Sequence, residues 1–208
     1  GGNSSSTNYS NESTFGEIAT GESGSTNFSL KAGYQQMQNV YISIATVADV
    51  TLTPSINGNS GGTANGSTTI TVLTDNPAGY ELFISASSSP ALISGANSFA
   101  NYTPAGGVPD FTFTIATNTS EFGFSPEGSA IVSNFKDNGS VCGVGSLDTT
   151  DSCWNPLTTT STLIASESVP NFPSGTDTVL KFRAQSGVSN VQSAGVYTAT
   201  STVTAVAL

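Results

Sequence analysis

The residues of this chain that could do chemistry are acids, hydroxyls and lysines, because the sequence contains no histidine. The absence of imidazole excludes a Ser-His-Asp triad, a Cys-His pair and acid–base catalysis by histidine. A serine–lysine dyad would need Lys31, Lys136 or Lys181, and none of them lies in a recognisable nucleophile motif. The fourteen acids are spread along the chain, and their spacing reveals no pair for glycoside hydrolysis. A hydrolase is therefore the least favoured reading, and the sequence predicts a protein that is not an enzyme and needs no cofactor.

Calcium is the metal that the acids of this chain would suit. Asp137 lies shortly before Cys142, and Asp148 and Asp151 lie shortly before Cys153. Hard oxygen ligands on a loop favour Ca²⁺, although the spacing departs from the EF-hand pattern. Solvated loop acids are the alternative, and a thermal melt with and without chelator separates the two readings.

The two cysteines, Cys142 and Cys153, enclose a loop rich in Gly, Ser and Asp. Without histidine or a second cysteine pair, four zinc ligands are not available. The pattern favours a short-loop disulfide formed in an oxidising compartment, which would fix a long surface excursion. An internal isopeptide bond would need a lysine on a strand, and Lys181 alternates with Leu180 and Phe182, which turns it outward.

The charge balance limits the partners. The net charge is −10, and Lys31, Lys136, Lys181 and Arg183 are the basic residues. Four scattered cations cannot form the basic face that nucleic acid or an anionic membrane requires. A neutral surface rich in hydroxyls suits a fibre that packs against copies of itself, and it also suits a secreted protein adapted to its medium.

The ends of the chain suggest export. It begins with Gly1 rather than Met, as expected after removal of a signal peptide. No run approaches the roughly 20 apolar residues of a membrane span, and the last residues, which extend an apparent strand, leave no room for a sorting signal. We expect an extracellular protein at the cell surface.

Eight asparagines stand in the pattern Asn-X-Ser/Thr, which marks acceptors for N-linked glycans. A chain this rich in Asn, Ser and Thr also forms the pattern by chance, and its use depends on the source. The candidates are Asn3, Asn8, Asn11, Asn27, Asn65, Asn101, Asn118 and Asn138.

Apolar residues recur at every second position in several segments, which is the pattern of a strand with one buried face. We expect strands at 28–34, 40–44, 50–52, 70–72, 80–86, 111–115, 180–184 and 197–206. Residues 57–66 are expected to form a loop and residues 75–79 a hairpin turn. The spacing predicts an all-β fold, an antiparallel sandwich of the Ig-like or jelly-roll kind with an extended N-terminal arm.

The chain divides by composition into an arm with its connector at 1–38 and a sandwich at 39–208. The arm is poor in apolar residues and repeats a short segment, Ser-Thr-Asn-Tyr-Ser at 6–10 and Ser-Thr-Asn-Phe-Ser at 25–29. The stretch around 126–173 holds both cysteines and Trp154, and we interpret it as an insertion between sandwich strands.

Five segments together resemble a family of proteins. They are AGYQQMQ at 32–38, LTPSI at 52–56, TDNPAGY at 74–80, FGFSP at 122–126 and GVYTAT at 195–200. The chain resembles uncharacterised secreted β-sandwich surface proteins of candidate-phyla-radiation bacteria (Patescibacteria), from about residue 6 to the end. More loosely it is similar to bacterial surface domains of the WxL kind, but it lacks their Trp-x-Leu signatures. The resemblance implies an exported envelope protein and supplies no catalytic residue.

Two functions remain open from the sequence. The first is a pilus-like filament, in which the arm of one subunit pairs as a strand with the next, anchored by Phe15, Ile18, Phe28 and Leu30. The second is a monomeric adhesin that contacts a glycan or another cell surface through the loop at 57–66 and the disulfide loop.

Overall fold

The computed structural model of the chain describes residues 2–6, 9–13, 21–25, 28–32, 40–45 and 47–208. The chain divides into two units, residues 1–41 and 42–208, whereas the sequence predicts the boundary after residue 38. Each unit is described by itself.

The described backbone of the first unit forms two antiparallel hairpins. β1 (Gly2–Ser6) pairs with β2 (Tyr9–Ser13), and β3 (Gly21–Ser25) pairs with β4 (Phe28–Ala32). The closing pairs, Ser6 with Tyr9 and Ser25 with Phe28, occupy the same place in the two copies of the repeated segment. The sequence repeat therefore corresponds to a repeat of the backbone, and the strand expected at 28–34 begins as β4.

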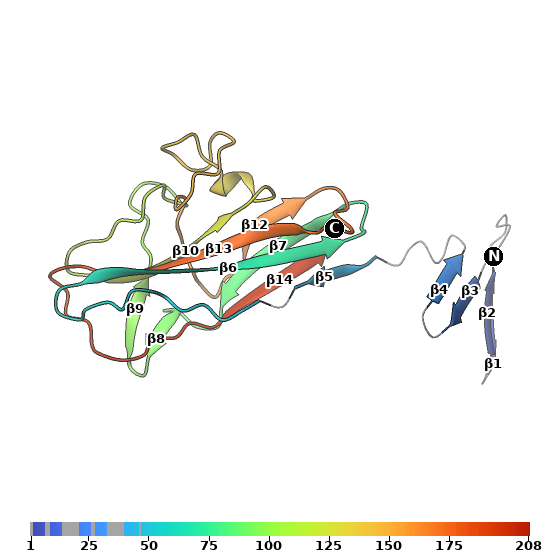
Figure 1. The fold of residues 1–208 in the computed structure, drawn as a ribbon, viewed down its shortest axis with the longest axis horizontal. Coiled ribbons are helices and arrows are strands. Elements are labelled where there is room, and N and C mark those ends of the chain that lie inside the picture. Colours follow the sequence, from blue (N-terminus) through green and yellow to red (C-terminus); the bar gives the residue numbers. More distant parts are fainter. Residues whose placement is uncertain (1, 7–8, 14–20, 26–27, 33–39, 46) are drawn as a thin grey trace. The chain divides into compact units, whose positions relative to one another are not determined.

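The second unit contains a seven-stranded sheet. Its strands are β5 (Ile42–Ile44), β6 (Gly62–Thr74), β8 (Leu92–Ser94), β9 (Asn97–Asn101), β10 (Ser120–Glu127), β11 (Asn155–Pro156) and β13 (Thr176–Ser186). Their order is β5-β6-β13-β10-β9-β8, with β11 also beside β10 (Figure 1). The short pairing of β9 with β10 is parallel, which departs from the antiparallel pattern that the sequence predicts.

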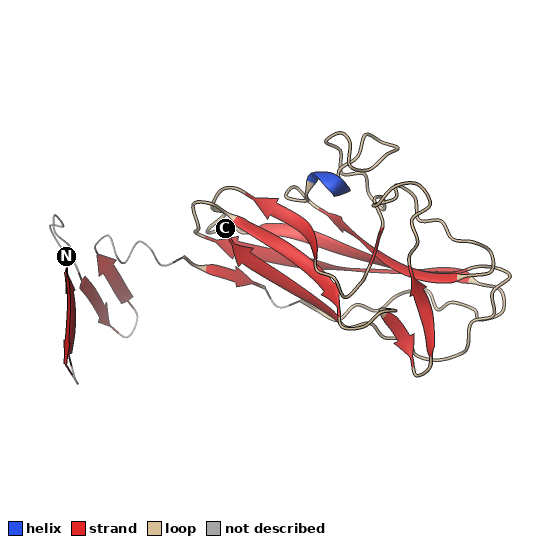
Figure 2. Ribbon diagram, turned by 180° about the vertical axis from the view of Figure 1, so that it is seen from behind, coloured by secondary structure: helices blue, strands red, loops and turns tan. Residues whose placement is uncertain are grey.

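A smaller sheet consists of β7 (Tyr80–Ala86), β12 (Thr162–Glu167) and β14 (Ser201–Ala207), in the order β12-β7-β14. The chain crosses between the sheets from β6 to β7 and again from β12 to β13. Residues 75–79 therefore form an arch, and the predicted hairpin is wrong because β6 and β7 pair with other strands. Figure 2 shows both sheets and the 3-10 turn η2 (Ser133–Phe135) beside them.

The two sheets pack against each other around a shared hydrophobic core. Alternate residues of β6, β7 and β13 point into it, and Ile70, Leu82 and Leu180 are almost completely buried there. Burying one such side chain stabilises the fold by roughly 1.5–3 kcal/mol. The prediction of an all-β sandwich is confirmed, and the strands expected at 80–86 and 180–184 are present.

A second cluster of aromatic rings packs against the other side of β13. The ring of Phe113 stacks on Tyr102 with 4.1 Å between centroids and meets Trp154 edge-on at 5.3 Å, and all three are buried. Arg183, which alternates with core-facing residues of β13, lies over the rings of Phe113 and Trp154. Covered on both sides, β10 has six consecutive buried residues and therefore lacks the alternation by which strands are recognised.

Several expected elements differ from those observed. The predicted loop at 57–66 ends early, because β6 begins at Gly62 and pairs with β13 along its Gly-, Asn- and Ser-rich first half. Residues 50–52 and 111–115 are not strands, although their apolar side chains do contact the two clusters. The stretch at 126–173, expected as an insertion, contains β12, which is a strand of the smaller sheet.

Candidate functional site

One edge of the smaller sheet, the outer side of β14, has backbone groups that pair with no strand among the described residues. Leu208 N donates to Gly79 O, and Ser87 N donates to Thr200 O, so the even-numbered residues of this segment direct their N–H and C=O groups to β7. The odd-numbered residues then direct theirs away from the sheet. Within the part of the chain that the structure describes, no strand pairs with that side of β14. The residues that present these groups are Ser201, Val203, Ala205 and Ala207.

The opposite edge of the same sheet is covered. Val132 N donates to Ile164 O at 3.1 Å, and Ser166 N donates to Ala130 O at 2.8 Å, which continues the sheet beyond β12. The smaller sheet is therefore closed on one side and open at β14 among the described residues. An open strand edge can add a further strand, because the added chain satisfies its N–H and C=O groups.

Half-buried hydrophobic side chains lie on β14 and on the segment that follows β5. Val203 and Ala205 point from β14 toward the core, and Val47, Val50 and Leu52 reach it from the irregular segment that follows β5. β5 itself lies beside β14 in space but belongs to the other sheet. Side chains of the central strands are buried completely, whereas those along this edge keep part of their surface exposed. An added strand would bury that remaining apolar surface.

Gly66 on β6 makes room for the irregular segment. A Cβ at this position would lie 2.6 Å from Val50 Cγ1 and 3.0 Å from Leu52 Cδ2. The segment pairs with β6 before and after this point, where Ala45 N donates to Thr71 O and Thr53 exchanges hydrogen bonds with Asn65. Between these contacts it leaves the ladder and folds its side chains over Gly66. The core is therefore closed here by packing and not by a paired strand.

β14 lacks the features by which monomeric proteins protect their edges. Lysine, proline and inward-pointing charges block unwanted pairing in many sheets. Residues 184–208 contain no charged side chain and no proline. Thr and Val make up four of the seven residues of β14 and favour the extended conformation. The edge is thus chemically suited to accept another strand.

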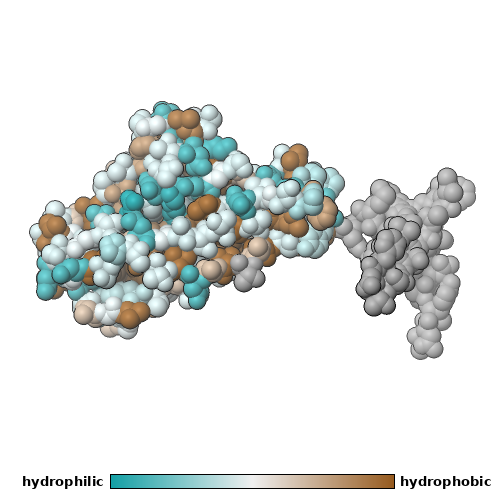
Figure 3. All heavy atoms as spheres, in the orientation of Figure 1, coloured by the Kyte–Doolittle hydropathy of each residue, from teal (hydrophilic) through white to brown (hydrophobic). Residues whose placement is uncertain are grey.

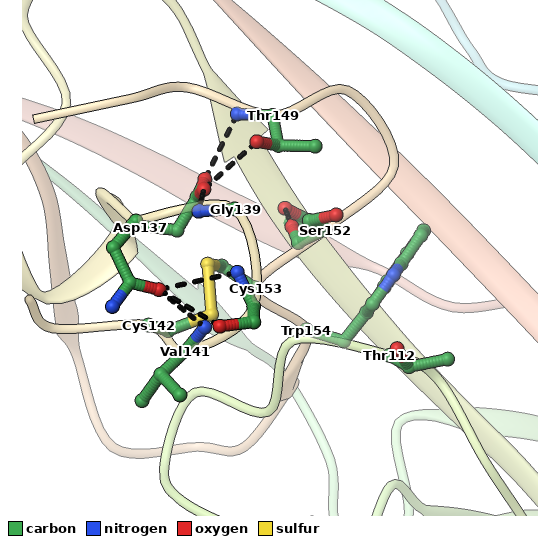
Figure 4. Close-up of a disulfide and its surroundings, with 12 residues drawn as sticks. Thr112, Asp137, Gly139, Val141, Cys142, Thr149, Ser152, Cys153 and Trp154 are labelled. Atoms are coloured by element: carbon green, nitrogen blue, oxygen red, sulfur yellow. Dashed lines mark hydrogen bonds between the residues drawn. A yellow bond between two sulfur atoms is a disulfide. The ribbon is translucent and has the colours of Figure 1, made fainter. Parts of the chain in front are cut away.

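The disulfide joins Cys142 and Cys153 with 5.7 Å between their Cα atoms, as the sequence predicts (Figure 4). The loop folds around Asp137, whose carboxylate is buried and accepts hydrogen bonds from Gly139 N, Thr149 N and Thr149 Oγ1 at 2.6–2.9 Å. Burial acts to raise the pKa of Asp137, but these hydrogen bonds outweigh it and hold the pKa below its usual value. Asp137 thus connects the two parts of the loop, at Gly139 and Thr149, through hydrogen bonds.

The acids that the sequence offered for calcium face different partners. Both oxygens of Asp137 accept hydrogen bonds inside the loop, and Asp148 Oδ2 accepts one from Gly128 N at 2.8 Å. Asp151 Oδ1 lies 3.0 Å from Lys181 Nζ. No group of three or more metal-ligating side chains that could hold a metal occurs among the described residues. The structure therefore does not bring these acids together around a common point.

Lys181 lies on the side of β13 that faces away from the core, as alternation predicts. Its Nζ is 3.0 Å from Glu127 Oε1 and 3.0 Å from Asp151 Oδ1. Partial burial acts to lower the pKa of Lys181, but the hydrogen bonds and charges of these two acids raise it above its usual value. The amine is held as an ammonium ion, which is not a nucleophile, so the arrangement favours an ion pair over an isopeptide bond.

A shallow hollow of about 290 Å³ lies beside this ion pair and beside Trp154 of the aromatic cluster. Asn65, Asp151, Trp154 and Lys181 are among its lining residues. Arg183 stacks 4.4 Å from the Trp154 ring, and its Nε donates to Asn65 Oδ1 at 2.7 Å. Sequence reasoning missed this grouping because its members come from three separate segments. With its charged groups already paired, the hollow carries no reactive side chain.

The remaining predicted residues are placed as follows. Phe28 and Leu30 lie on β4, and Phe15 and Ile18 lie outside the described residues. The four candidate sequons of the second unit are Asn65 on β6, Asn101 on β9, and Asn118 and Asn138 in loops, of which all but the half-buried Asn101 are exposed. Asn3 and Asn11 lie on β1 and β2, and Asn8 and Asn27 lie outside the described residues.

Comparison with protein-family models, with curated proteins and with solved structures finds no match. Among the described residues, no helix is long and apolar enough to cross a membrane. The function must therefore be argued from the geometry of the chain itself.

Proposed function

We propose that this protein is a structural subunit of an extracellular filament, in which β14 of one subunit accepts a strand from the N-terminal arm of the next. The observation that supports this most is the outer side of β14, which is uncharged and with which no described strand pairs. An incoming strand would lie about 4.8 Å from β14. It would pair with the outward N–H and C=O groups and cover the half-buried side chains beside them.

The arm has the chemistry of a donor strand. Phe28 and Leu30 stand two positions apart in the sequence of β4, which is the spacing of an apolar strand pattern. A two-stranded hairpin is marginally stable by itself, so β3 and β4 would gain stability by joining a larger sheet. Phe15 and Ile18 are the other candidate anchors in the arm.

Donor and acceptor are different surfaces of the chain, so the contact is head-to-tail. A head-to-tail contact that does not close into a ring propagates into a filament. The disulfide fits an oxidising, extracellular compartment. The resemblance to exported proteins of candidate-phyla-radiation bacteria agrees with this location.

The test compares two proline substitutions in β14, each of which removes a backbone N–H on a different side of the strand. Ala205→Pro removes an outward N–H, and we expect it to abolish filaments in negative-stain electron microscopy while the melting temperature stays within a few degrees of wild type. Thr204→Pro is the matched control: it removes an N–H that faces β7 and should lower the melting temperature itself. Filaments of unchanged length in Ala205→Pro would overturn strand addition at β14.

Deleting residues 1–27 locates the donor. Filaments that survive this deletion would confine the donated strand to residues 28–34 or exclude the arm as the donor, and filaments that are lost would assign it to the deleted part. Isolated monomers from the wild-type chain at every concentration would remove the filament and leave the second candidate.

The second candidate is a monomeric adhesin, and the disulfide loop favours it. Val141, Val144 and Leu147 are each about half exposed, at 53%, 47% and 52%, on a loop braced by the disulfide and by Asp137. Exposed apolar side chains on a rigid loop are typical of a contact surface. Binding of the monomer to cells, lost in Val144→Ser and retained in Ala205→Pro, would support this function.

A further inference from the structure

The second unit has an exposed apolar projection at one end of its long sheet. Phe172, Val169 and Leu208 are 61%, 57% and 53% exposed. Phe172 N donates to Thr74 O at the end of β6, and Leu208 N donates to Gly79 O in the arch that follows. A Cβ on Gly79 would lie 2.9 Å from Val169 N, which places this residue at the same arch. These three side chains form what we call the apolar knob.

The other end of the same sheet has a hollow of about 210 Å³. Gly62 and Thr63 at the start of β6 line it, together with Ile115, Thr117 and Val188. None of the residues that line this end hollow is charged, and Val188 is 68% exposed at its rim. The hollow is open to solvent, and its volume is of the order of the roughly 150 Å³ that an enclosed cavity needs to accept benzene.

The knob and the end hollow lie at opposite ends of one strand. Gly62 is the first and Thr74 the last of the 13 residues of β6. At about 3.3 Å per residue this strand separates the two features by roughly 40 Å. Figure 1 shows β6 running along the sandwich with the C-terminus near one end, and Figure 3 shows hydrophobic residues at both ends. One chain therefore cannot bring its own knob into its own hollow.

We propose that Phe172 of one copy inserts into the end hollow of a second copy, between Thr63, Ile115 and Val188. This contact rests on the proposed filament and adds to it the axial interface between successive sandwiches. A knob that fits a hollow elsewhere on an identical molecule makes a head-to-tail contact, and such a contact forms an open filament when the subunits do not close into a ring. The apolar side chains at both ends lose their exposed surface in it.

Charge favours this pairing over a symmetric one. Glu167 lies two residues before Val169 of the knob, so two knobs facing each other would bring like charges together. The segments that form the other end, residues 57–63, 114–120 and 185–197, carry no charged side chain. Two end hollows facing each other would leave both unfilled. Knob against hollow is the arrangement that avoids both penalties.

The experiment mixes two full-length variants that each lose one half of the contact. Phe172→Ser removes the knob, and Val188→Asp places a carboxylate at the rim of the end hollow; both sites are exposed, so both chains should fold. Each variant alone should raise the critical concentration for assembly about tenfold or more. Val141→Ser, at a site on the disulfide loop that is 53% exposed, is the control and should leave the critical concentration unchanged.

The mixture of the two variants separates this inference from the filament proposal. One variant keeps the hollow and the other keeps the knob, so an alternating pair has one complete contact and one contact that is altered on both sides. Below the critical concentration of either variant, the mixture should therefore form a heterodimer in sedimentation that neither variant forms alone. Assembly of Phe172→Ser at the wild-type concentration would overturn the knob contact. If Ala205→Pro abolishes assembly while Phe172→Ser does not, strand addition stands and the knob contact alone is rejected.

Discussion

At the scale of the residue, a buried carboxylate organises the disulfide loop. Asp137 accepts three hydrogen bonds, and its backbone also exchanges hydrogen bonds with Leu147 across the loop. The three side-chain hydrogen bonds are donated to the carboxylate oxygens. The folded loop therefore stabilises the ionised form of Asp137 more than the protonated form. The pKa of Asp137 is consequently lowered in the folded protein.

This linkage predicts a pH-dependent effect of Asp137→Asn. The stabilisation exists above the unfolded pKa of about 3.9 and is lost as the pH falls through the lower folded pKa. We expect Asp137→Asn to destabilise the protein by about 1–3 kcal/mol at neutral pH, and the difference from wild type to shrink in acid. Urea unfolding followed by Trp154 fluorescence measures it.

Asp148→Asn is the matched control for that substitution. Asp148 is exposed and accepts one backbone hydrogen bond, so its replacement should change the unfolding midpoint less. A difference between Asp137→Asn and wild type that stays the same from neutral to acid pH would contradict the proposed linkage.

At the scale of the element, the edge of β14 is open because the nearby segment pairs with another strand. Its own sequence is an ordinary Thr- and Val-rich strand, and the segment that could have paired with it follows β6 instead. That segment leaves its ladder at Gly66, where Val50 and Leu52 fill the space that a side chain would take. Closure of this side of the core therefore depends on one glycine.

We expect Gly66→Ala to displace the segment at 47–52. The added methyl would meet Val50 Cγ1 at 2.6 Å, and the resulting overpacking should destabilise the fold by about 1–3 kcal/mol. Gly107→Ala is the control, because a Cβ there meets Pro109 O at 3.5 Å, which is an ordinary contact. Denaturant midpoints compare the two, and equal midpoints would show that the segment is not packed over Gly66.

At the scale of the whole molecule, the proposed contacts are apolar and main-chain in character while the chain carries a net charge of −10. Repulsion between copies opposes assembly at low salt, and salt screens it within a Debye length of about 3 Å at 1 M. Raising sodium chloride from about 0.05 M to about 1 M should therefore lower the critical concentration or leave it unchanged. Sedimentation at several salt concentrations measures this. Filaments that dissolve in high salt would indicate ion pairs between subunits and contradict the proposed contacts.

The sequence by itself determined the fold class, the outward placement of Lys181 and the pairing of the cysteines. These follow from local rules, since side chains alternate along any strand and two cysteines allow one pairing. Only the tertiary structure decided which strands share a sheet, so the turn at 75–79 is an arch and not a hairpin. It also decided that β10 is buried on both faces and that β14 is left open. Strand pairing and burial depend on contacts between segments that are distant in the sequence. A local sequence pattern therefore cannot predict them.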